Sequence, residues 1–530
     1  MKKNILIFVL IIIFAGILRF WHLGQNPPSL DWDEASLGYN AYSLLKTGKD
    51  EYGTPFPISI RSFGDYKPGL YTYLTIPSVA VFGLNEFSVR FVSALFGTLS
   101  IVVGYSLFKQ LFSSKRDKHA LLFCFFFSVS PWHIQFSRVA FESNLSVFFV
   151  ITGLWLFLKG LTKGKYFVLS TLFFVLSVYS YHSPRLVVPV LLIVLAVIYR
   201  REFINKLKWI FVSAVLFGLL VSPVIYQLQG STGARFSSVS VISGEKLENS
   251  IRLLEKDRAK NDLLGSLTHN RRVVFAQEII AGYLDHFNLD FLFLTGDPPG
   301  RHHANGMGML YWWDAFFVIL GIIYCLSNRN KKTGTVIVWL LIAPIASALT
   351  TGTPHAVRAL LLVPVYQIII TLGFIAFLRH LRTIQKYQVL MKLILSVVFC
   401  LFLINFYYYL DVYWIHTPSE RSEDWQYGYR EAVETAHKYE SSVDRVIVTY
   451  AYDQPYIFFL FYDRIDPSWY QNLWKGGEIQ RSYRSFGKYE FRKINWEQDS
   501  ELKNVILIGT PSEIPEQAQG KIGDIRFLDG

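Results

Sequence analysis

Long apolar runs recur along this chain and are separated by short polar stretches. Runs of roughly 20 residues have the length that an α-helix needs to cross the apolar core of a bilayer. We count eleven of them, near residues 4–22, 87–112, 119–136, 141–160, 166–181, 184–200, 208–228, 309–327, 334–351, 355–378 and 389–410. A helix satisfies its own backbone hydrogen bonds, which lipid cannot do for it. The pattern therefore predicts an all-α polytopic membrane protein.

Composition and charge support this class and indicate an orientation. Of the 530 residues, 52% are hydrophobic and 17% charged, whereas a soluble domain carries about 25% charged residues. The formal net charge is +12, but the basic residues lie mainly in every second loop between spans. This is the pattern of cytoplasmic loops, so we expect no nucleic-acid partner. It predicts a multi-pass protein of the plasma or inner membrane with a cytoplasmic N-terminus.

The polar stretches divide the chain into two predicted domains. Residues 1–410 form the transmembrane domain, with long outer loops at 23–86 and 229–308. Residues 411–530 form a hydrophilic tail outside the cytoplasm. The tail alternates a helical stretch near 424–440 with strand-like runs near 443–448 and 505–508, which predicts a small α/β domain.

The first outer loop opens with three carboxylates in four residues, Asp31-Trp32-Asp33-Glu34. Leucines at helical spacing follow, so a short amphipathic helix should start at these acids and end at Gly48. We expect a second helix to begin at Pro68, because proline suits the first turn of a helix.

Asp33 and Glu34 are candidate catalytic residues. A carboxylate within hydrogen-bond reach of an acceptor hydroxyl can take its proton during group transfer. The alternative is a helix N-cap, where Asp is favoured. A cap needs one acid rather than three, and acids beside a membrane span are costly unless used or paired. We therefore favour Asp33 as the base and Glu34 as its support.

A lone cation follows in Gly64-Asp65-Tyr66-Lys67-Pro68-Gly69. If a helix starts at Pro68, Lys67 lies at a helix N-terminus, where backbone N–H groups already favour anions. Lys67 is thus a candidate ligand for a phosphate. The alternative is an interfacial lysine that only extends its ammonium to water.

Two further pairs of ionisable residues lie at predicted outer ends of spans. Arg138 and Glu142 are four residues apart, which would place both on one helix face, either as site residues or as a structural ion pair. His355 and Arg358 are three apart at the start of the span 355–378. An arginine inside an apolar helix needs an anionic partner, which could be a lipid-linked phosphate or a carboxylate of this chain.

His302 and His303 lie in a turn-rich stretch of the second outer loop. Adjacent histidines point in different directions and rarely share one metal ion. A contact with donor or acceptor is another interpretation, and ordinary polar loop residues a third. The sequence establishes no cofactor and leaves a divalent metal ion open.

In order and spacing these motifs resemble those of the GT-C superfamily of membrane glycosyltransferases, specifically the protein O-mannosyltransferase and aminoarabinose–lipid A transferase group (glycosyltransferase family 39-like). The likeness rests on Asp33-Glu34, on Asp65-Tyr66-Lys67-Pro68, on Arg138 and on His355-Ala356-Val357-Arg358, and covers about residues 1–410. Some relatives have an acid directly before the Lys-Pro. Tyr66 stands there in this chain, with Asp65 one place earlier, which puts a metal at that position in doubt.

The resemblance implies inverting transfer of a hexose or pentose from a polyprenyl-phosphate donor to an extracytoplasmic acceptor, namely a protein, a glycolipid or a cell-envelope glycan. It implies Asp33 as base and Lys67, Arg358 and Arg138 as contacts to the donor phosphate, with membrane lipids as surroundings. Independently of the family, the chain has no glycine-rich nucleotide-binding loop, which argues against a nucleotide-sugar donor. Two alternatives remain, a lipid-linked sugar flippase or transporter and an oligosaccharide polymerase or ligase.

Overall fold

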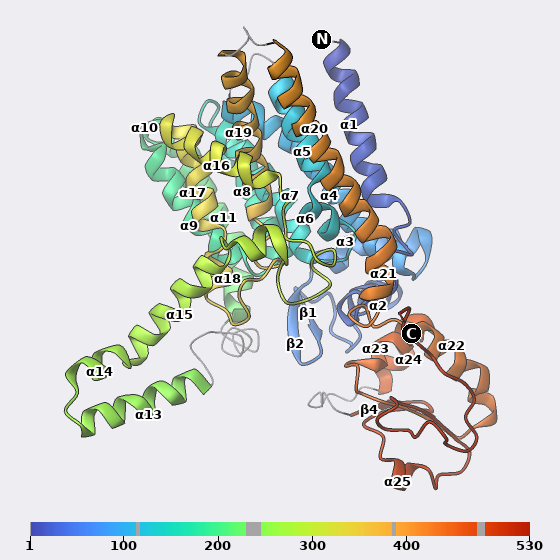
Figure 1. Ribbon diagram of the computed structural model, residues 1–530. Helices are drawn as coiled ribbons and strands as arrows, with labels where there is room; N and C mark the ends of the chain where they lie inside the picture. The colour runs from blue at the N-terminus through green and yellow to red at the C-terminus, as the bar shows by residue number, and fades with distance from the viewer. Residues whose placement is uncertain (1, 113–116, 229–244, 384–387, 474–482, 530) are drawn as a thin grey trace. The chain divides into compact units, whose positions relative to one another are not determined.

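The computed structural model describes residues 2–112, 117–228, 245–383, 388–473 and 483–529 (Figure 1). The chain forms two compact units. The first unit comprises Met1–Arg19, Phe96–Phe136 and Glu142–Leu410, and the second comprises Phe20–Leu95, Ser137–Phe141 and Asp411–Gly530. Each unit is therefore assembled from segments that are far apart in the sequence.

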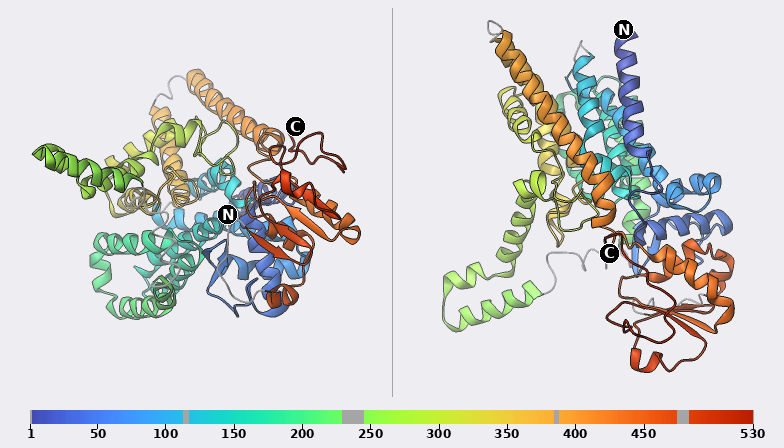
Figure 2. Two further views of the ribbon diagram at one scale, coloured as in Figure 1. Left: turned by 90° about the horizontal axis from the view of Figure 1, so that it is seen from below. Right: turned by 45° about the vertical axis from the view of Figure 1, so that its right-hand side comes forward.

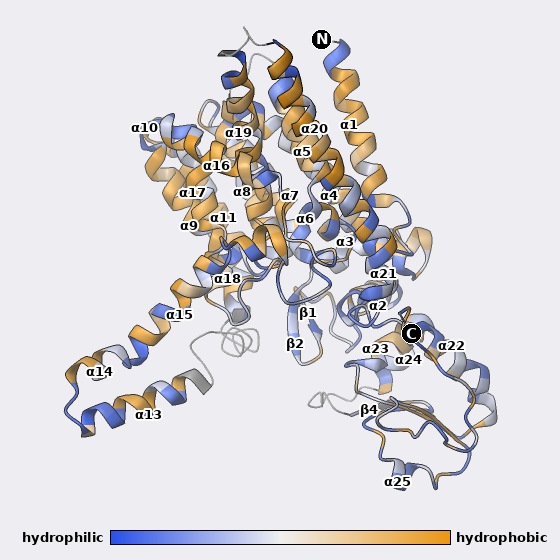
Figure 3. Cartoon of the chain, viewed as in Figure 1, coloured by the Kyte–Doolittle hydropathy of each residue, from blue (hydrophilic) through white to orange (hydrophobic). Residues whose placement is uncertain are grey.

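Apolar helices, orange in Figure 3, make up most of the first unit. Two of them, α11 (Leu207–Leu228) and α20 (Gln388–Asp411), leave most of their apolar side chains exposed, as helices that face lipid do. The main helices are α1 Lys2–Phe20, α4 Glu86–Phe112, α5 Lys118–Val129, α6 Pro131–Ser137, α7 Glu142–Gly160, α8 Lys165–Ser180, α9 Pro184–Ile198, α11 Leu207–Leu228, α16 Asp314–Ser327, α17 Lys331–Ile342, α19 Leu362–Thr383 and α20 Gln388–Asp411. Helix α4 belongs to this unit only from Phe96 onward. Shorter elements are α10 Arg200–Ile204, η1 Asp290–Leu294 and α18 Ile345–Ala348.

Within this unit, α7 packs on α8 and α16 packs on α19; Figure 2 shows the chain from two further sides. Glycines permit the close approach of α16 and α19. A Cβ atom at Gly321 would collide with the carbonyl oxygen of Ile369, and one at Gly373 with that of Phe317. Small residues let backbones of membrane helices pack this closely.

In the described part of the chain, seven helical runs are long and apolar enough to cross a bilayer, and the bent pair α5–α6 makes an eighth. Each of the eleven predicted spans contains at least one helix. Helices α8, α9 and α16 are shorter than the length required of a membrane-crossing helix.

Two of the predicted spans differ in detail. The span 119–136 is bent by 60° between α5 and α6, because Pro131 has no N–H to continue the hydrogen-bond ladder of α5. The span 355–378 begins too early, since residues 355–361 form turns and α19 starts at Leu362. Pro364 then lies in the first turn of α19, where proline is tolerated.

Helices α13 Glu245–Ala259, α14 Leu263–Thr268 and α15 Arg271–Asp285 form an arm beside the other helices of the first unit (Figure 1). Asp262 caps α14 by accepting the N–H of Gly265, and Asn270 caps α15 by accepting that of Arg272. Helices were predicted for 230–272, and residues 230–244 lie outside the described part.

In the second unit, the first outer loop forms α2 Trp32–Thr47, a hairpin of β1 Ser59–Ser62 and β2 Asp65–Pro68, and α3 Leu70–Phe82. The predicted helix from the acids to Gly48 is confirmed, and Gly48 ends it with a φ of 68°. The second predicted helix is confirmed as α3, but it begins at Leu70 and not at Pro68. Phe63 and Gly64 have φ values of 54° and 78°, which suit a two-residue hairpin turn, so the following residues pair as a strand.

The tail of the second unit contains a four-stranded sheet, with the strands in the order β4 (Arg484–Phe486), β5 (Tyr489–Phe491), β3 (Arg445–Val448) and β6 (Val505–Ile508). Strand β3 is parallel to β5 and β6, while β4 and β5 are antiparallel. The predicted strands near 443–448 and 505–508 are confirmed. The tail elements are η2 Val412–His416, α21 Thr417–Glu420, α22 Tyr429–Tyr439, η3 Glu440–Ser442, β3 Arg445–Val448, α23 Pro455–Tyr462, α24 Pro467–Leu473, β4 Arg484–Phe486, β5 Tyr489–Phe491, α25 Trp496–Asp499 and β6 Val505–Ile508.

Candidate functional site

The three acids at the start of α2 have three different environments. Asp31 is the N-cap of the helix, and its Oδ1 accepts the backbone N–H of Glu34 at 2.8 Å. Its side chain is buried. The capping interpretation therefore holds for Asp31 and leaves the other two acids to be explained.

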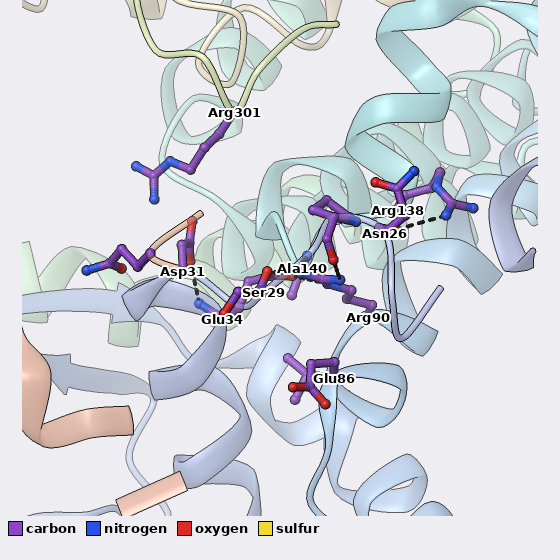
Figure 4. Close-up of polar contacts among 12 residues, drawn as sticks. Asn26, Ser29, Asp31, Glu34, Glu86, Arg90, Arg138, Ala140 and Arg301 are labelled. Carbon is purple, nitrogen blue, oxygen red and sulfur yellow. Dashed lines mark hydrogen bonds and ion pairs between the residues drawn. The ribbon is translucent and has the colours of Figure 1, made fainter. Parts of the chain in front are cut away.

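Glu34 forms a buried ion pair with Arg90 of α4 (Figure 4). Arg90 Nε lies 2.9 Å from Oε1 of Glu34, and its Nη2 lies 2.8 Å from Oε2. The N–H of Ala140 also donates to Oε1, at 2.8 Å. The remaining N–H groups of Arg90 donate to the carbonyl oxygens of Leu23, Pro27 and Ser29. Because both side chains are at most 1% exposed, this pair joins segments of the second unit.

Asp33 is the most accessible of the three acids, with 40% of its side chain exposed. Its Oδ1 accepts a hydrogen bond from Nζ of Lys67, which lies on β2 and is largely buried. The ammonium of Lys67 also lies 5.3 Å from the ring centre of Phe63. The structure thus brings the predicted base and the predicted phosphate ligand into direct contact.

Lys67 was predicted to lie at a helix N-terminus. This prediction is wrong, because the residue lies in strand β2. Its neighbours Asp65 and Tyr66 are half-buried in the same strand, and Asp65 Oδ1 accepts the N–H of Tyr66 at 2.7 Å. Successive residues of a strand point to opposite faces. Lys67 therefore shares a face with Asp65 and not with Tyr66.

Arg138 and Glu142 do not share a helix face as predicted. Residues 138–141 are not helical, and Glu142 is the first residue of α7, because the chain leaves α6 before Arg138. Arg138 is completely buried in the second unit. Its Nε lies 3.0 Å from the hydroxyl of Tyr413, and its Nη2 lies 2.8 Å from the carbonyl oxygen of Asn26. These contacts hold the non-helical segment 138–141 in place. A contact of Arg138 with the donor phosphate stays a prediction.

The predicted histidines lie in the first unit, in two turn-rich segments. His302 Nδ1 is 2.6 Å from Oδ2 of Asp297. The ring centres of His302 and His355 are 5.1 Å apart. His303 is buried separately, with its ring nitrogens 3.0 Å from the carbonyl oxygen of Ala304 and 2.8 Å from that of Asp297. His302 and His355, predicted from different motifs, are thus neighbours.

Arg358 is not inside an apolar helix as predicted but in the turns before α19. Its Nη1 donates to the hydroxyl of Thr350 at 2.6 Å and to the carbonyl oxygen of Thr351 at 2.7 Å. Burial, together with the positive charge of Arg358, lowers the pKa of His355 to about 2. The imidazole of His355 is therefore neutral at physiological pH.

Comparison with known proteins connects this geometry to a family. Residues 66–226 match the family dolichyl-phosphate-mannose-protein mannosyltransferase. The resemblance seen in the sequence is confirmed. The putative mannosyltransferase YkcB of Bacillus subtilis (strain 168) is 32% identical over 22% of this chain and 15% of its own length. A protein of Aquifex aeolicus (strain VF5) is 31% identical over 32% of each chain. The matched regions thus span a third or less of these relatives.

Solved structures share the fold of the chain. ArnT from Cupriavidus metallidurans has a TM-score of 0.53 at 12% identity, over 86% of this chain and 84% of that chain. The same protein bound to undecaprenyl phosphate gives 0.52. The Archaeoglobus fulgidus oligosaccharyltransferase tethered with an acceptor peptide gives 0.52 at 14% identity, over 87% and 63% of the two chains. The protein is thus a multi-pass membrane protein that shares the fold of these solved structures.

Sequence reasoning missed two residues of these clusters, Arg90 and Asp297. Arg90 lies near the start of a predicted span, and an arginine in an apolar helix requires a partner, a signal that could have identified it. Asp297 lies in Thr295-Gly296-Asp297-Pro298, a stretch typical of turns. No pattern there distinguishes a carboxylate with a site role from a turn former.

Proposed function

We propose that this protein is an inverting glycosyltransferase that moves a hexose or pentose from a polyprenyl-phosphate donor to an extracytoplasmic acceptor. The acceptor is a protein, a glycolipid or a cell-envelope glycan. The observation that carries the proposal is the pair of Asp33 and Lys67, a half-exposed carboxylate in contact with the ammonium of a lysine. Transfer of a sugar from a phosphate to a hydroxyl needs one group of each kind.

The different surroundings of the acids support Asp33 as the base. Asp31 is occupied as a cap, and both oxygens of Glu34 are held by Arg90 and Ala140. Asp33 alone among the three combines substantial exposure with a flexible cationic partner. Glu34 then acts indirectly, because it fixes the first turn of α2 on which Asp33 lies.

The pairing of Asp33 with Lys67 suggests how the site responds to its donor. Before the donor binds, Lys67 neutralises the carboxylate of Asp33. A donor phosphate competes for the ammonium, because charge-assisted hydrogen bonds to phosphate are strong. Asp33 is then released to accept the proton of the acceptor hydroxyl.

The reaction that follows is a single displacement at the anomeric carbon. The acceptor oxygen forms a bond to that carbon while the bond to the phosphate oxygen breaks. The bonding electrons leave with the polyprenyl phosphate, whose additional negative charge Lys67 stabilises electrostatically. The acceptor proton passes to Asp33, and attack opposite the leaving group inverts the anomeric configuration.

The choice of donor is supported by the relatives. The name of the matched family includes dolichyl-phosphate mannose. The ArnT of similar fold was solved bound to undecaprenyl phosphate. We propose eleven crossings, one for each apolar helical run. With the basic loops in the cytoplasm, this number places α2, the hairpin and the tail outside, where lipid-linked donors are the expected sugar source.

Transfer by the purified protein tests this proposal. The protein would be given labelled polyprenyl-phosphate hexoses and pentoses, beginning with the mannose donor, together with peptide, glycolipid and glycan acceptors. Wild type should transfer label with inverted configuration, as measured by NMR of the product. Asp33→Asn should lower the rate by about 10²- to 10⁴-fold, the usual contribution of a general base.

A matched control is available in the pair Lys109–Asp117, which joins an ammonium and a carboxylate 2.7 Å apart with comparable exposure of the acid. Asp117→Asn should leave transfer unchanged. A wild-type rate in the Asp33→Asn variant would eliminate Asp33 as the base. Absence of transfer from every polyprenyl-phosphate donor and acceptor would refute the proposed function itself.

A further inference from the structure

Three side chains with metal-binding atoms converge within the first unit, away from the acids at the start of α2 in the sequence. They are Asp297 and His302 from the turns that precede α16, and His355 from the turns that precede α19. One ligand atom from each lies within 4.8 Å of the other two. Carboxylate oxygen and imidazole nitrogen are common ligands of zinc.

Two atoms of this cluster are buried without a hydrogen-bond partner among the described residues. They are Oδ1 of Asp297 and Nδ1 of His355. Asp297 is only 3% exposed. Burying a carboxylate oxygen or a ring nitrogen without a hydrogen-bond partner is unfavourable, so each such atom requires an explanation.

The other contacts of Asp297 and His355 hold these atoms in place. Oδ2 of Asp297 lies 2.6 Å from Nδ1 of His302 and accepts the N–H of Ala356 at 2.8 Å. The backbone N–H of His355 lies 3.2 Å from Nε2 of His286. The carboxylate and the imidazole are therefore fixed by their neighbours, while one ligand atom of each is left unused.

His303 is excluded from the cluster by its own contacts. Both of its ring nitrogens lie within 3.0 Å of backbone carbonyl oxygens. The adjacent histidines therefore have different roles, as expected for neighbours in a loop that point in different directions.

We propose that Asp297, His302 and His355 bind one zinc ion. Zinc bonds of about 2.0–2.1 Å place tetrahedral ligands roughly 3.3 Å apart. The ligand atoms are now up to 4.8 Å apart, and small rotations of the side chains would bring them to that separation. Asp297 supplies the negative charge that offsets the nearby Arg358.

The zinc ion would connect two segments that are about fifty residues apart in the sequence. It would join the turns before α16 to those before α19 and satisfy both unpartnered atoms at once. Three protein ligands leave one coordination position open, as in zinc sites that accept water or a substrate oxygen. The inference goes beyond the proposed function, and its test measures metal rather than transfer.

The experiment measures zinc per chain in the full-length protein, purified in detergent with an affinity tag that contains no histidine. After treatment with a chelator and dialysis against zinc, mass spectrometry should find one zinc ion per wild-type chain. His302→Gln and His355→Gln should each reduce binding at low zinc concentration by about 10-fold or more. Cobalt should bind the same site and show the intense visible absorption of a four-coordinate ion.

His269→Gln is the matched control, because His269 and Asp257 form another His–Asp contact, at 2.5 Å, without a third ligand in the described cluster. This variant should retain the zinc ion. Zinc binding at wild-type strength in both His302→Gln and His355→Gln would overturn the proposal. So would wild-type protein that binds no zinc, or cobalt that shows only the weak spectrum of a six-coordinate ion. Asp297→Asn provides a third variant should one histidine variant fail to fold.

Discussion

Replacing Glu34 by glutamine should destabilise the second unit without removing any group that touches substrate. The change keeps the size of the side chain and removes its charge. Arg90 would then be an unpaired cation with no exposed surface. Its three bonds to backbone carbonyl oxygens would remain, but these partners carry no charge.

The expected magnitude follows from the burial of the pair. Removing one partner of a buried ion pair costs about 3–5 kcal/mol, because the other charge stays desolvated. For a unit of this size, 1 kcal/mol corresponds to a shift of about 2–4 °C in the unfolding midpoint. Glu34→Gln should therefore lower the midpoint by roughly 6–20 °C.

Thermal unfolding of the purified protein in detergent, followed by tryptophan fluorescence, measures this shift. Asp33→Asn is the natural control, since it neutralises the adjacent acid in the same helical turn. Asp33 is 40% exposed, so water already screens part of its interaction with Lys67, and this variant should lose much less stability than Glu34→Gln. The two neighbouring acids would then have different roles, because the Glu34 variant loses stability and the Asp33 variant loses transfer.

A double variant sharpens the test. In Glu34→Gln/Arg90→Met the buried charge is removed, so its loss of stability should be smaller than the sum of the two single losses. A midpoint of Glu34→Gln equal to that of wild type would refute the reasoning. Strictly additive losses in the double variant would show that the two residues do not act as a pair.

Two further predictions concern other residues of the second unit. Lys67→Gln should raise the KM for the polyprenyl-phosphate donor by about 10- to 100-fold, the value of a charge-assisted hydrogen bond, whereas Lys109→Gln should not, as steady-state kinetics would show. Burial raises the pKa of Glu51 to about 7 from an ordinary value of 4.5, so the folded state binds this proton more tightly than the unfolded state. Stability from this group is therefore full below pH 4.5 and falls as the pH rises to 7, by about 3 kcal/mol. Glu51→Gln should match wild type at pH 4.5 and unfold at a higher temperature at pH 8, and equal midpoints at pH 8 would contradict this account.

The helices of the first unit could be predicted from the sequence because an apolar run in a membrane protein allows few structures. Breaks within runs were harder to place. Pro131 interrupts a run that is mostly apolar, and hydropathy alone does not register a missing N–H. Likewise, apart from His355 and Arg358 the turns at 355–361 consist of Ala, Val and Leu, so hydropathy does not separate them from the helix that follows.

The candidate site could be predicted in part, and the limit lies in partners that are distant in the sequence. The acids and Lys67 stand out because charge is rare in an apolar chain. The ion pair of Glu34 with Arg90 joins residues 56 positions apart, and spacing does not encode which of several cations an acid meets. The hairpin at 59–68 was missed because four-residue strands carry little periodic signal and Pro68 favoured a helix start.

The order of segments in the second unit has a consequence for evolution and engineering. Gln426 accepts the N–H of Trp32 at 2.9 Å, and Tyr413 accepts hydrogen bonds from both Asn26 and Arg138. Residues beyond 410 thus complete hydrogen bonds that begin near residue 26. A chimaera that imported only the tail of another protein would inherit mismatched partners, so successful exchange should require the first loop and the tail to be transplanted as a set.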